Sequence, residues 1–264
     1  GTVTGSVVTS VGSSSITDRD QWLGLAGGFG QVRIGTISTV YKSHGAMVDP
    51  LYRTSLQGRD RGLQLARLQS GAGEEIQGRA TNTIRFDSAN YNGLKVGATY
   101  TLDNNETDGE DDNPYGIGAS YENGGILAFA DYITNDGGSS NAAGDLTAWK
   151  VGGKFTMNAF AIMGQYEDLS NDNTGTSDFT QWHVGGTYTM GNNLIYAAYG
   201  ANNQDPAAGN DVDTDAYTIA LMHSLSKRTK VYAGYNNQDN DGGEPGVAAD
   251  LDRDQWSLGM KHLF

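Results

Sequence analysis

The sequence predicts an all-β fold, a transmembrane antiparallel up-and-down β-barrel, from three observations. Long and short connections alternate along the whole chain. The segments between them are about ten residues long, which suits tilted strands that cross a bilayer. Side chains in these segments alternate with period two: Trp149, Val151 and Phe155 share one face, and Lys150 and Lys154 lie on the other. One face therefore suits hydrocarbon and the other suits water.

Short connections such as 27–30 (GGFG) and 122–125 (ENGG) are hairpin-sized and supply Gly or Asn for positive φ. The longest connection, about 39–79, is too long for a structureless loop and needs a role of its own. The chain is expected to be one domain, 1–264, because large barrels are single domains. The fourteen predicted strands lie near 2–11, 19–27, 30–38, 80–88, 93–102, 114–122, 125–134, 146–156, 158–167, 179–189, 193–202, 214–224, 229–238 and 254–264.

Composition excludes several classes of function. The chain has 264 residues and no Cys, so disulfides, thiol catalysis and cysteine metal sites are absent. A net charge of −14 argues against a nucleic-acid partner. No apolar run reaches the length of a transmembrane helix. The chain begins at Gly1 without a charged and apolar leader, which predicts a processed or cut polypeptide.

Charge is divided between the connections and the strands. Acids crowd the long connections, which predicts an acidic outer rim; divalent cations could bind there weakly, although simple solvation explains the acids as well. Bases lie mainly on the strand face opposite the apolar one, which predicts a basic interior. The predicted pore-lining bases are Arg19, Arg33, Arg85, Lys150 and Lys154.

A second pattern marks the start of six segments that follow a long connection. Each carries Asp four residues before an aromatic side chain, and such positions share a strand face about 13 Å apart. Aromatic rings favour the boundary between headgroups and acyl chains, so the pattern predicts a girdle. The alternative is that these strands simply open with turn residues followed by β-formers. The predicted girdle consists of Trp22, Tyr115, Trp149, Trp182, Tyr217 and Trp256.

The last strand, WSLGMKHLF, ends on Phe264 and resembles the assembly signal of Gram-negative outer-membrane proteins. Three further stretches resemble the trimeric general-diffusion porins: QWLGLAGGFGQVRIG (21–35), NTIRFDSANYNGLKVGATY (82–100) and LSKRTKVYAGY (225–235). The resemblance covers most of the chain from Arg19 onward. It implies an outer-membrane homotrimer without a cofactor, in contact with the lipid bilayer and lipopolysaccharide, that passes ions and small hydrophilic solutes. It also implies that the barrel-assembly machinery reads the terminal Phe264 as its signal.

The resemblance further implies a constriction. Porins of this kind have sixteen strands, and 2–11 lies where the third would be, so we expect a first hairpin to be missing and the chain to be a piece of a longer polypeptide. Their third external loop folds into the barrel, and here 39–79 follows the matching strand. Arg19 and Arg85 resemble wall arginines, and Arg33 faces the lumen by parity. The acids expected to face them from the loop are Asp49, Asp60, Glu74 and Glu75.

The predicted function is therefore passive diffusion through a water-filled pore with a weak preference for anions. A substrate-specific outer-membrane channel is the main alternative. An outer-membrane barrel enzyme and a soluble β-sandwich adhesin are further alternatives. The four His residues show no metal-ligand spacing, and no nucleophile elbow or phosphate-binding loop is present.

Overall fold

A computed structural model describes residues 2–7, 20–65, 79–102, 113–135, 146–171, 177–206, 211–241 and 252–263. Short helices occur only between β3 and β4 in this part of the chain: α1 (Val40–Gly45), η2 (Ala46–Val48) and η3 (Gly58–Asp60). The strands are β1 (Thr2–Val7), β2 (Gln21–Gly27), β3 (Gly30–Ser38), β4 (Arg79–Ser88), β5 (Leu94–Thr101), β6 (Tyr115–Asn123), β7 (Ile126–Asn135), β8 (Leu146–Met157), β9 (Phe160–Asn171), β10 (Ser177–Met190), β11 (Asn193–Pro206), β12 (Val212–Ser224), β13 (Thr229–Asp241) and β14 (Arg253–His262).

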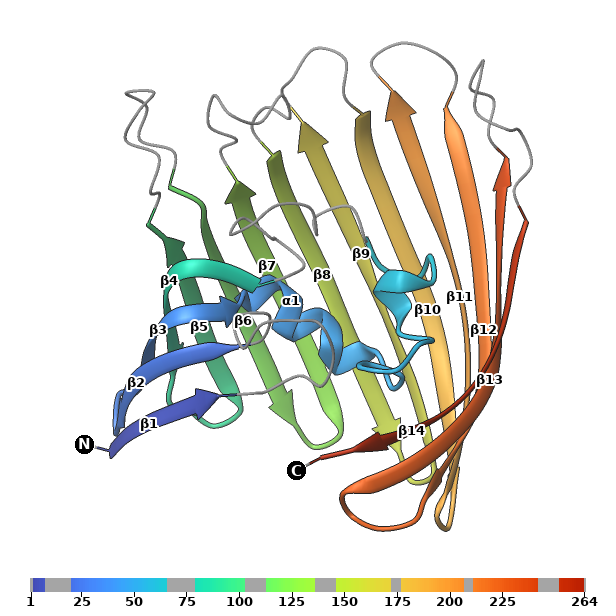
Figure 1. Cartoon of the computed structure of the whole chain (residues 1–264), viewed down its shortest axis with the longest axis horizontal. Helices are drawn as coiled ribbons and strands as arrows, with labels where there is room; N and C mark the ends of the chain where they lie inside the picture. The colour runs from blue at the N-terminus through green and yellow to red at the C-terminus, as the bar shows by residue number, and fades with distance from the viewer. Residues whose placement is uncertain are drawn as a thin grey trace.

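The strands form one antiparallel sheet in which each pairs with its neighbours in sequence, so that β1 and β14 are the two edges (Figure 1). This up-and-down order confirms the predicted all-β topology. Tight turns join the strands at one end, and Asn92, Asn158 and Gly191 have the positive φ that such turns require. Of the first predicted strand, residues 8–11 lie outside the described part of the chain.

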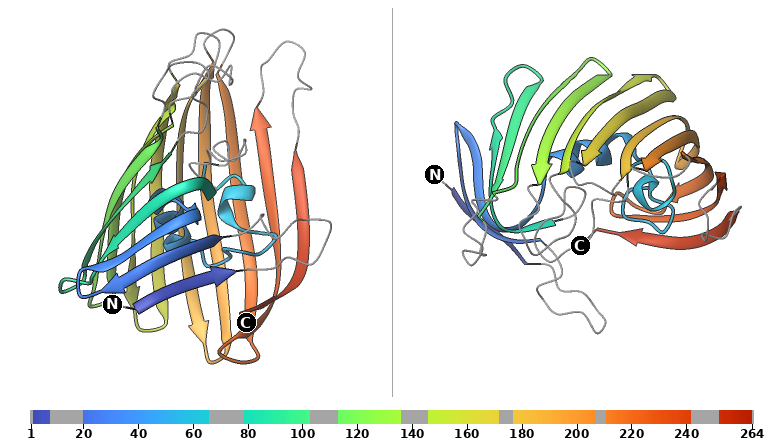
Figure 2. Two further views of the ribbon diagram at one scale, coloured as in Figure 1. Left: turned by 60° about the vertical axis from the view of Figure 1, so that its left-hand side comes forward. Right: turned by 90° about the horizontal axis from the view of Figure 1, so that it is seen from above.

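The sheet is strongly curved, and residues 40–65 lie on its concave side (Figure 2). We call residues 40–65 the inward segment and the concave side the lumenal face. Helix α1 contacts β5, β6 and β7. The inward segment is therefore the described part of the predicted loop 39–79.

The convex face is apolar and exposed. Trp149, Val151 and Phe155 of β8 are 41%, 46% and 48% exposed, whereas Lys150 on the other face is fully buried. The alternation predicted for this strand is thus present in the structure. Among the described residues, no helix has the length and apolar character needed to cross a bilayer.

A second apolar surface lies on the lumenal face of the later strands. The inward segment contributes Val48, Leu51, Leu56 and Leu63 to a core with wall side chains of β7 to β13. The wall side chains of this core are Leu127, Phe129, Met163, Tyr196, Ala198, Ala216, Ala220, Met222 and Tyr232. The later strands are therefore apolar on both faces, one facing outward and one covered by the inward segment. Period-two alternation in the sequence predicts only the outward apolar face.

Strands β10 to β13 extend beyond their predicted ends, with 14, 14, 13 and 13 residues. Their extensions carry Asn and Asp that bond across the sheet. Asn203 Nδ2, for example, donates to Asp213 Oδ1 at 2.7 Å. Cross-strand polar pairs of this kind stabilise strand pairing where sequence composition alone indicates a loop.

Candidate functional site

The inward segment begins with helix α1, which has a capped N-terminus and packs against glycines of the wall. Thr39 precedes α1, and its hydroxyl accepts a hydrogen bond from the Lys42 backbone N–H at 3.2 Å. Val40 packs against β5 and β6 where both strands carry glycine. A Cβ at position 97 or 118 would lie 2.9 or 2.8 Å from a Val40 methyl group. Gly97 and Gly118 therefore leave the space in which the helix lies against the wall.

A row of buried polar side chains on the wall binds helix α1. Asp131, Lys150 and Glu167 lie directly opposite one another on β7, β8 and β9. Lys150 donates to the Tyr41 carbonyl, and its ammonium lies 3.9 Å from the Tyr41 ring centroid. His44 Nδ1 and Asp131 Oδ1 are 2.7 Å apart. The oppositely charged side chains of this row thus bind the inward segment at Tyr41 and His44.

Glu167 is the centre of this attachment. Its Oε2 accepts the Tyr41 hydroxyl at 3.0 Å, and its Oε1 accepts the Leu65 backbone N–H at 3.1 Å. Burial, followed by the negative charge of Glu167, raises the pKa of Tyr41 well above its usual value. The phenol therefore stays neutral and remains a donor. Both ends of the inward segment, at Tyr41 and at Leu65, converge on one carboxylate.

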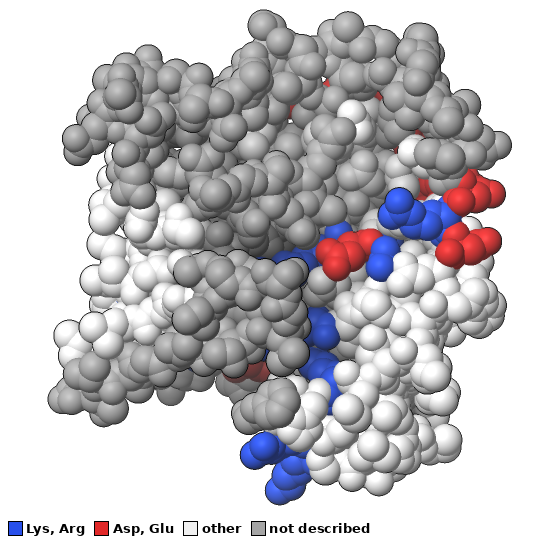
Figure 3. Space-filling view, in the orientation of Figure 1, with Lys and Arg blue, Asp and Glu red and all other residues white. Residues whose placement is uncertain are grey.

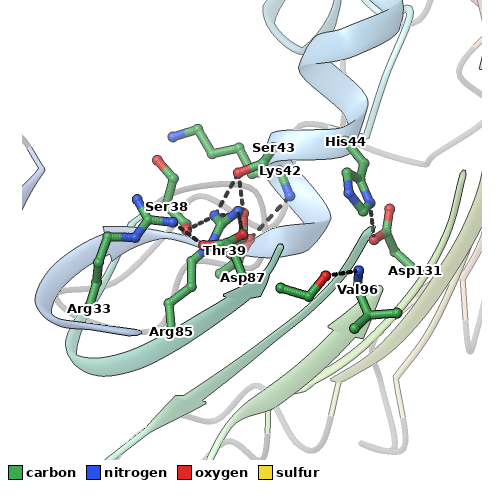
Figure 4. A network of polar contacts seen from close by, with 11 residues as sticks. Arg33, Ser38, Thr39, Lys42, Ser43, His44, Arg85, Asp87, Val96 and Asp131 are labelled. Carbon is green, nitrogen blue, oxygen red and sulfur yellow. Dashed lines mark hydrogen bonds and ion pairs between the residues drawn. The ribbon is translucent and has the colours of Figure 1, made fainter. Parts of the chain in front are cut away.

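A second charged group lies on β3 and β4 (Figure 4). Arg33 and Arg85 are directly opposite each other, and both bind Asp87. Arg85 donates to both Asp87 oxygens, with Nη2 to Oδ1 at 2.7 Å and Nε to Oδ2 at 3.0 Å. Its Nη1 donates to the Thr39 carbonyl at 3.0 Å and to Ser43 Oγ at 2.7 Å. Arg85 therefore joins the wall to the start of the inward segment.

At the tip of the inward segment, Asp49 organises the backbone. Its two oxygens accept the N–H groups of Leu51 and Gly58, each at 2.9 Å. Burial raises the pKa of Asp49 to about 6, although these hydrogen bonds and the charges of Lys261 and Arg59 oppose the shift. Asp49 is buried, so its carboxylate does not face the wall arginines across open water.

The tip exposes Arg53, Ser55 and Asp60, and Arg59 and Arg61 are half-buried beside them. The guanidinium groups of Arg53 and Arg59 lie 5.5 and 5.8 Å from the Tyr52 ring centroid. Arg61 donates to the Ser55 carbonyl at 2.7 Å, and burial lowers its pKa. Asp60 is the exposed acid here, and it lies 3.8 Å from Arg59.

The predicted pore-lining residues thus divide into groups. Arg33 and Arg85 come together around Asp87, and Asp60 is exposed on the inward segment. Lys150 and Asp49 are buried and serve as attachment points rather than as water-facing charges. Lys154 is half-buried on the lumenal face of β8, opposite Leu127 and Met163. Arg19, Glu74, Glu75 and the predicted assembly signal Phe264 lie outside the described residues.

Five of the six predicted girdle residues lie in one outward-facing row: Tyr115, Trp149, Trp182, Tyr217 and Trp256 are all exposed. Each contacts a tyrosine ring of a neighbouring strand, with centroids 4.7 to 6.3 Å apart. These partners lie on strands that follow short connections, so the spacing pattern after the long connections does not include them. The missed partners are Tyr132, Tyr166, Tyr199 and Tyr235.

Trp22 is a correction to the predicted girdle. The outward positions of β2 are taken by Leu23 and Leu25, which are 65% and 55% exposed. Trp22 has the opposite parity, and the guanidinium of Arg33 lies 5.2 Å from its ring centroid. The ring therefore lies on the lumenal face beside a cation, because two leucines occupy the outward positions of this strand.

The arrangement combines a wall with two faces of opposite polarity and a polar segment attached inside it. Within the described ranges, no three His, Asp or Glu side chains gather in a way that could hold a metal ion. A sheet that is apolar outside and carries hydrogen-bonded and charged groups inside can provide a water-lined path across a bilayer.

Comparison with known proteins identifies the family. The model of the Gram-negative porin family matches residues 3–243. No curated protein matches the chain. Among solved structures, the anion-selective porin from Comamonas acidovorans is similar, with a TM-score of 0.74 and 21% identity over 94% of this chain and 78% of that one.

Two further structures show the same fold. In-vitro folded OmpT, an outer membrane protein of Vibrio cholerae, has a TM-score of 0.68 and 17% identity over 92% of this chain and 79% of its own. OmpF of Salmonella typhi, in complex with daunomycin, has a TM-score of 0.67 and 13% identity over 92% of this chain and 77% of its own. The chain therefore belongs to the Gram-negative porin family, and it forms a water-filled channel in the outer membrane through which ions and small hydrophilic solutes diffuse.

Proposed function

We propose that the inward segment forms the waist of this channel and that the waist favours anions. The observation that carries the proposal is the charge of the segment tip. It exposes Arg53, with Arg59 and Arg61 half-buried beside it, whereas its acids are the buried Asp49 and the single exposed Asp60. Cations that line the narrowest part of a pore attract anions and repel cations.

The charged group on β3 and β4 adds to this positive charge. Arg33 and Arg85 share one carboxylate, Asp87, so this group carries a net positive charge. The anion-selective porin from Comamonas acidovorans has the same fold and provides a precedent. Acids of the outer rim act in the opposite direction, but salt screens charges over about 8 Å at physiological ionic strength. The preference at the waist is therefore expected to dominate.

Uptake of charged sugars into proteoliposomes tests this proposal. Three sugars of similar size that carry a negative, zero or positive charge are compared at equal concentration. We expect the anionic sugar to enter fastest and its rate to rise linearly with concentration. Fastest entry of the cationic sugar would contradict the proposal. A rate that saturates for one neutral sugar would favour the alternative, a substrate-specific channel.

We further propose that the chain assembles as a homotrimer through β2 to β5. These strands have only 7 to 10 residues, compared with 12 to 14 in β8 to β13. Their outward side chains are nevertheless apolar, as Leu23, Leu25 and Ile34 show. Strands this short form an apolar wall of small height, which suits contact with a protein neighbour better than contact with a bilayer of full thickness. OmpT of Vibrio cholerae has been solved as a trimer.

Native mass spectrometry of detergent-solubilised protein tests the trimer. The expected species has three times the mass of the chain, and Leu25→Glu should convert it to monomer. The matched control is Ile219→Glu on β12, which is also outward-facing and 54% exposed. A trimer that survives Leu25→Glu but dissociates with Ile219→Glu would place the interface elsewhere.

We also propose that the outer wall contacts the lipid bilayer and lipopolysaccharide. The outward aromatic row supports contact with the lipid bilayer and with lipopolysaccharide, since rings of this kind prefer the interface. Assembly by the barrel-assembly machinery, with Phe264 as signal, stays a prediction. We also propose passive transport without catalysis, which an assay of the purified protein for protease and lipase activity tests.

A further inference from the structure

Two lysines face each other on the lumenal side of the last two strands. Lys230 of β13 and Lys261 of β14 are cross-strand partners in the register. Directly opposite side chains have Cβ atoms about 5 Å apart, and like charges at that spacing repel. Lys261 is half-buried, which weakens the screening of this repulsion by water. The pair therefore costs free energy unless a negative group lies between or beside the two ammonium groups.

Among the described residues, no ion pair neutralises the two lysines. In the described part of the molecule, neither Lys230, Lys261 nor Arg53 forms an ion pair. Lys230 and Arg53 both repel the Lys261 ammonium electrostatically, and Asp49 is the acid that attracts it. The carboxylate of Asp49 already accepts two backbone N–H groups inside the segment tip. Its single charge thus acts on the tip backbone and on Lys261, and it cannot balance three cations.

The tip of the inward segment is fixed next to the two lysines. Lys261 Nζ donates to the Tyr52 carbonyl at 2.6 Å, which uses one of its three N–H groups. Ser55 Oγ and the Tyr232 hydroxyl are 3.0 Å apart, which joins the tip to β13. The guanidinium of Arg53 lies over the Tyr52 ring, 5.5 Å from its centroid. Arg53 is thereby held on the same side of the channel as the lysines.

Basic side chains continue along this side of the molecule. Figure 3 shows Lys and Arg one below another from the level of the inward segment to the end of the sheet with the short turns. Lys227 and Arg228 lie in the turn that joins β12 to β13, just before Lys230, and both are exposed. An anion that leaves the waist towards the short turns thus meets cations along its path.

We propose that Lys230, Lys261 and Arg53 form a binding station for a small oxyanion with two negative charges. The proposal rests on the anion preference proposed above and adds a defined site to it. Two ammonium groups at cross-strand spacing can each donate to a different oxygen of one dianion, and the guanidinium provides a third, planar donor. A chloride ion offers one charge and no second acceptor, so it gains less.

Single-channel currents in chloride with added inorganic phosphate test the station. At mildly alkaline pH, where phosphate is mostly a dianion, we expect the chloride current to fall with phosphate concentration and to level off, as for occupation of one site. Lys230→Gln should raise the half-saturating phosphate concentration about tenfold, because one charge-assisted hydrogen bond is lost. Lys230→Arg keeps the charge and should retain most of the affinity.

The matched control is Lys95→Gln. Lys95 is exposed on β5 and lies opposite Ser120 rather than opposite a cation. It should leave the response to phosphate unchanged. A linear response of the wild type, or equal weakening by Lys95→Gln and Lys230→Gln, would overturn the station. If anionic sugars still entered proteoliposomes fastest, the proposed anion preference would stand without it; fastest entry of cationic sugars would overturn both.

Discussion

Two pairs of like charges lie directly across the sheet on the lumenal face, and they differ in what surrounds them. Arg33 and Arg85 on β3 and β4 share the carboxylate of Asp87. Lys230 and Lys261 on β13 and β14 have no carboxylate between them among the described residues. The same geometry therefore occurs once with an internal counter-ion and once without.

The difference shows how one arrangement can serve structure or transport. The guanidinium of Arg85 donates hydrogen bonds to Asp87 on the wall and to Thr39 and Ser43, where the inward segment begins. Without a carboxylate, Lys230 and Lys261 leave charge and donors for solutes. A lumenal cation that shares a carboxylate is thus expected to hold the fold while it adds to the positive charge of the lumen. A cation without such a partner among the described residues is expected to act mainly on passing solutes.

Removing the shared carboxylate should have the largest effect. Asp87→Asn leaves two guanidinium groups directly opposite each other without a counter-ion. We expect the free energy of unfolding to fall by about 2 kcal/mol, less than for a fully buried pair because Asp87 is partly exposed. Denaturant unfolding followed by tryptophan fluorescence measures the change. Asp205→Asn, at an exposed position on β11, should have little effect, and equal loss in both variants would contradict this role of Asp87.

The buried attachment of the inward segment gives the next largest effect. Tyr41→Phe removes the hydroxyl that Glu167 accepts at 3.0 Å. We expect a loss of about 1.5 kcal/mol, because one oxygen of a buried carboxylate loses its partner. Faster proteolysis within residues 40–65 and noisier single-channel currents should accompany it. In Tyr52→Phe, which removes a hydroxyl with no hydrogen bond among the described residues, both readouts should match the wild type.

Acidification should stabilise the tip of the inward segment. The pKa of Asp49 is about 6 in the folded protein, above the usual 3.8, so the folded state binds a proton over this interval more readily than the unfolded state. Stability of the tip is therefore expected to rise as pH falls through 6, by about 1 kcal/mol between pH 7 and 5. Hydrogen exchange of the backbone amides of residues 49–58 measures it. The dependence should disappear in Asp49→Asn, and a tip that loosens on acidification would contradict the assignment.

Introducing a counter-ion into the lysine pair should have the smallest effect on stability. Lys230→Glu places an acid directly opposite Lys261 and converts repulsion into attraction. We expect the free energy of unfolding to rise by about 0.5 kcal/mol, together with loss of the phosphate response. Thermal unfolding of the detergent-solubilised protein measures the gain. Lys95→Glu, with Ser120 opposite, should show no such gain; a decrease in Lys230→Glu would mean that the two lysines do not repel each other.

Much of the fold could be predicted from sequence because the bilayer imposes a simple rule. Trp149, Val151 and Phe155 alternate with polar positions, and they are exposed on the outward face as expected. Strand ends were less predictable, since the Asn203 and Asp213 pair extends β11 and β12 into a stretch whose composition is that of a loop.

The second apolar surface could also have been found from the sequence. In β7 and β12 the runs ILAFA and IALM are apolar at consecutive positions, so both faces of these strands avoid water. Period-two alternation alone hides this signal. A strand that is apolar on both faces needs cover inside the channel, and the inward segment provides it.

The site itself was less predictable. Trp22 follows the spacing of the girdle but lies beside Arg33, because Leu23 and Leu25 occupy the outward positions. Asp49 was expected to face the wall, yet its carboxylate accepts backbone N–H groups whose positions only the folded tip defines. Lys150 has the right parity for the lumen and is nevertheless buried beneath Tyr41. Parity identifies the face of a strand but not what covers it.

The reversal potential in a salt gradient tests the central claim most directly. Purified wild-type protein is inserted into a planar bilayer between concentrated and dilute potassium chloride, and the voltage at zero current is read. A waist lined by Arg53, Arg59 and Arg61, with Lys230 and Lys261 beside it, should give the sign that corresponds to net chloride permeation. A potential of the opposite sign, or a bilayer that stays electrically silent, would contradict the account.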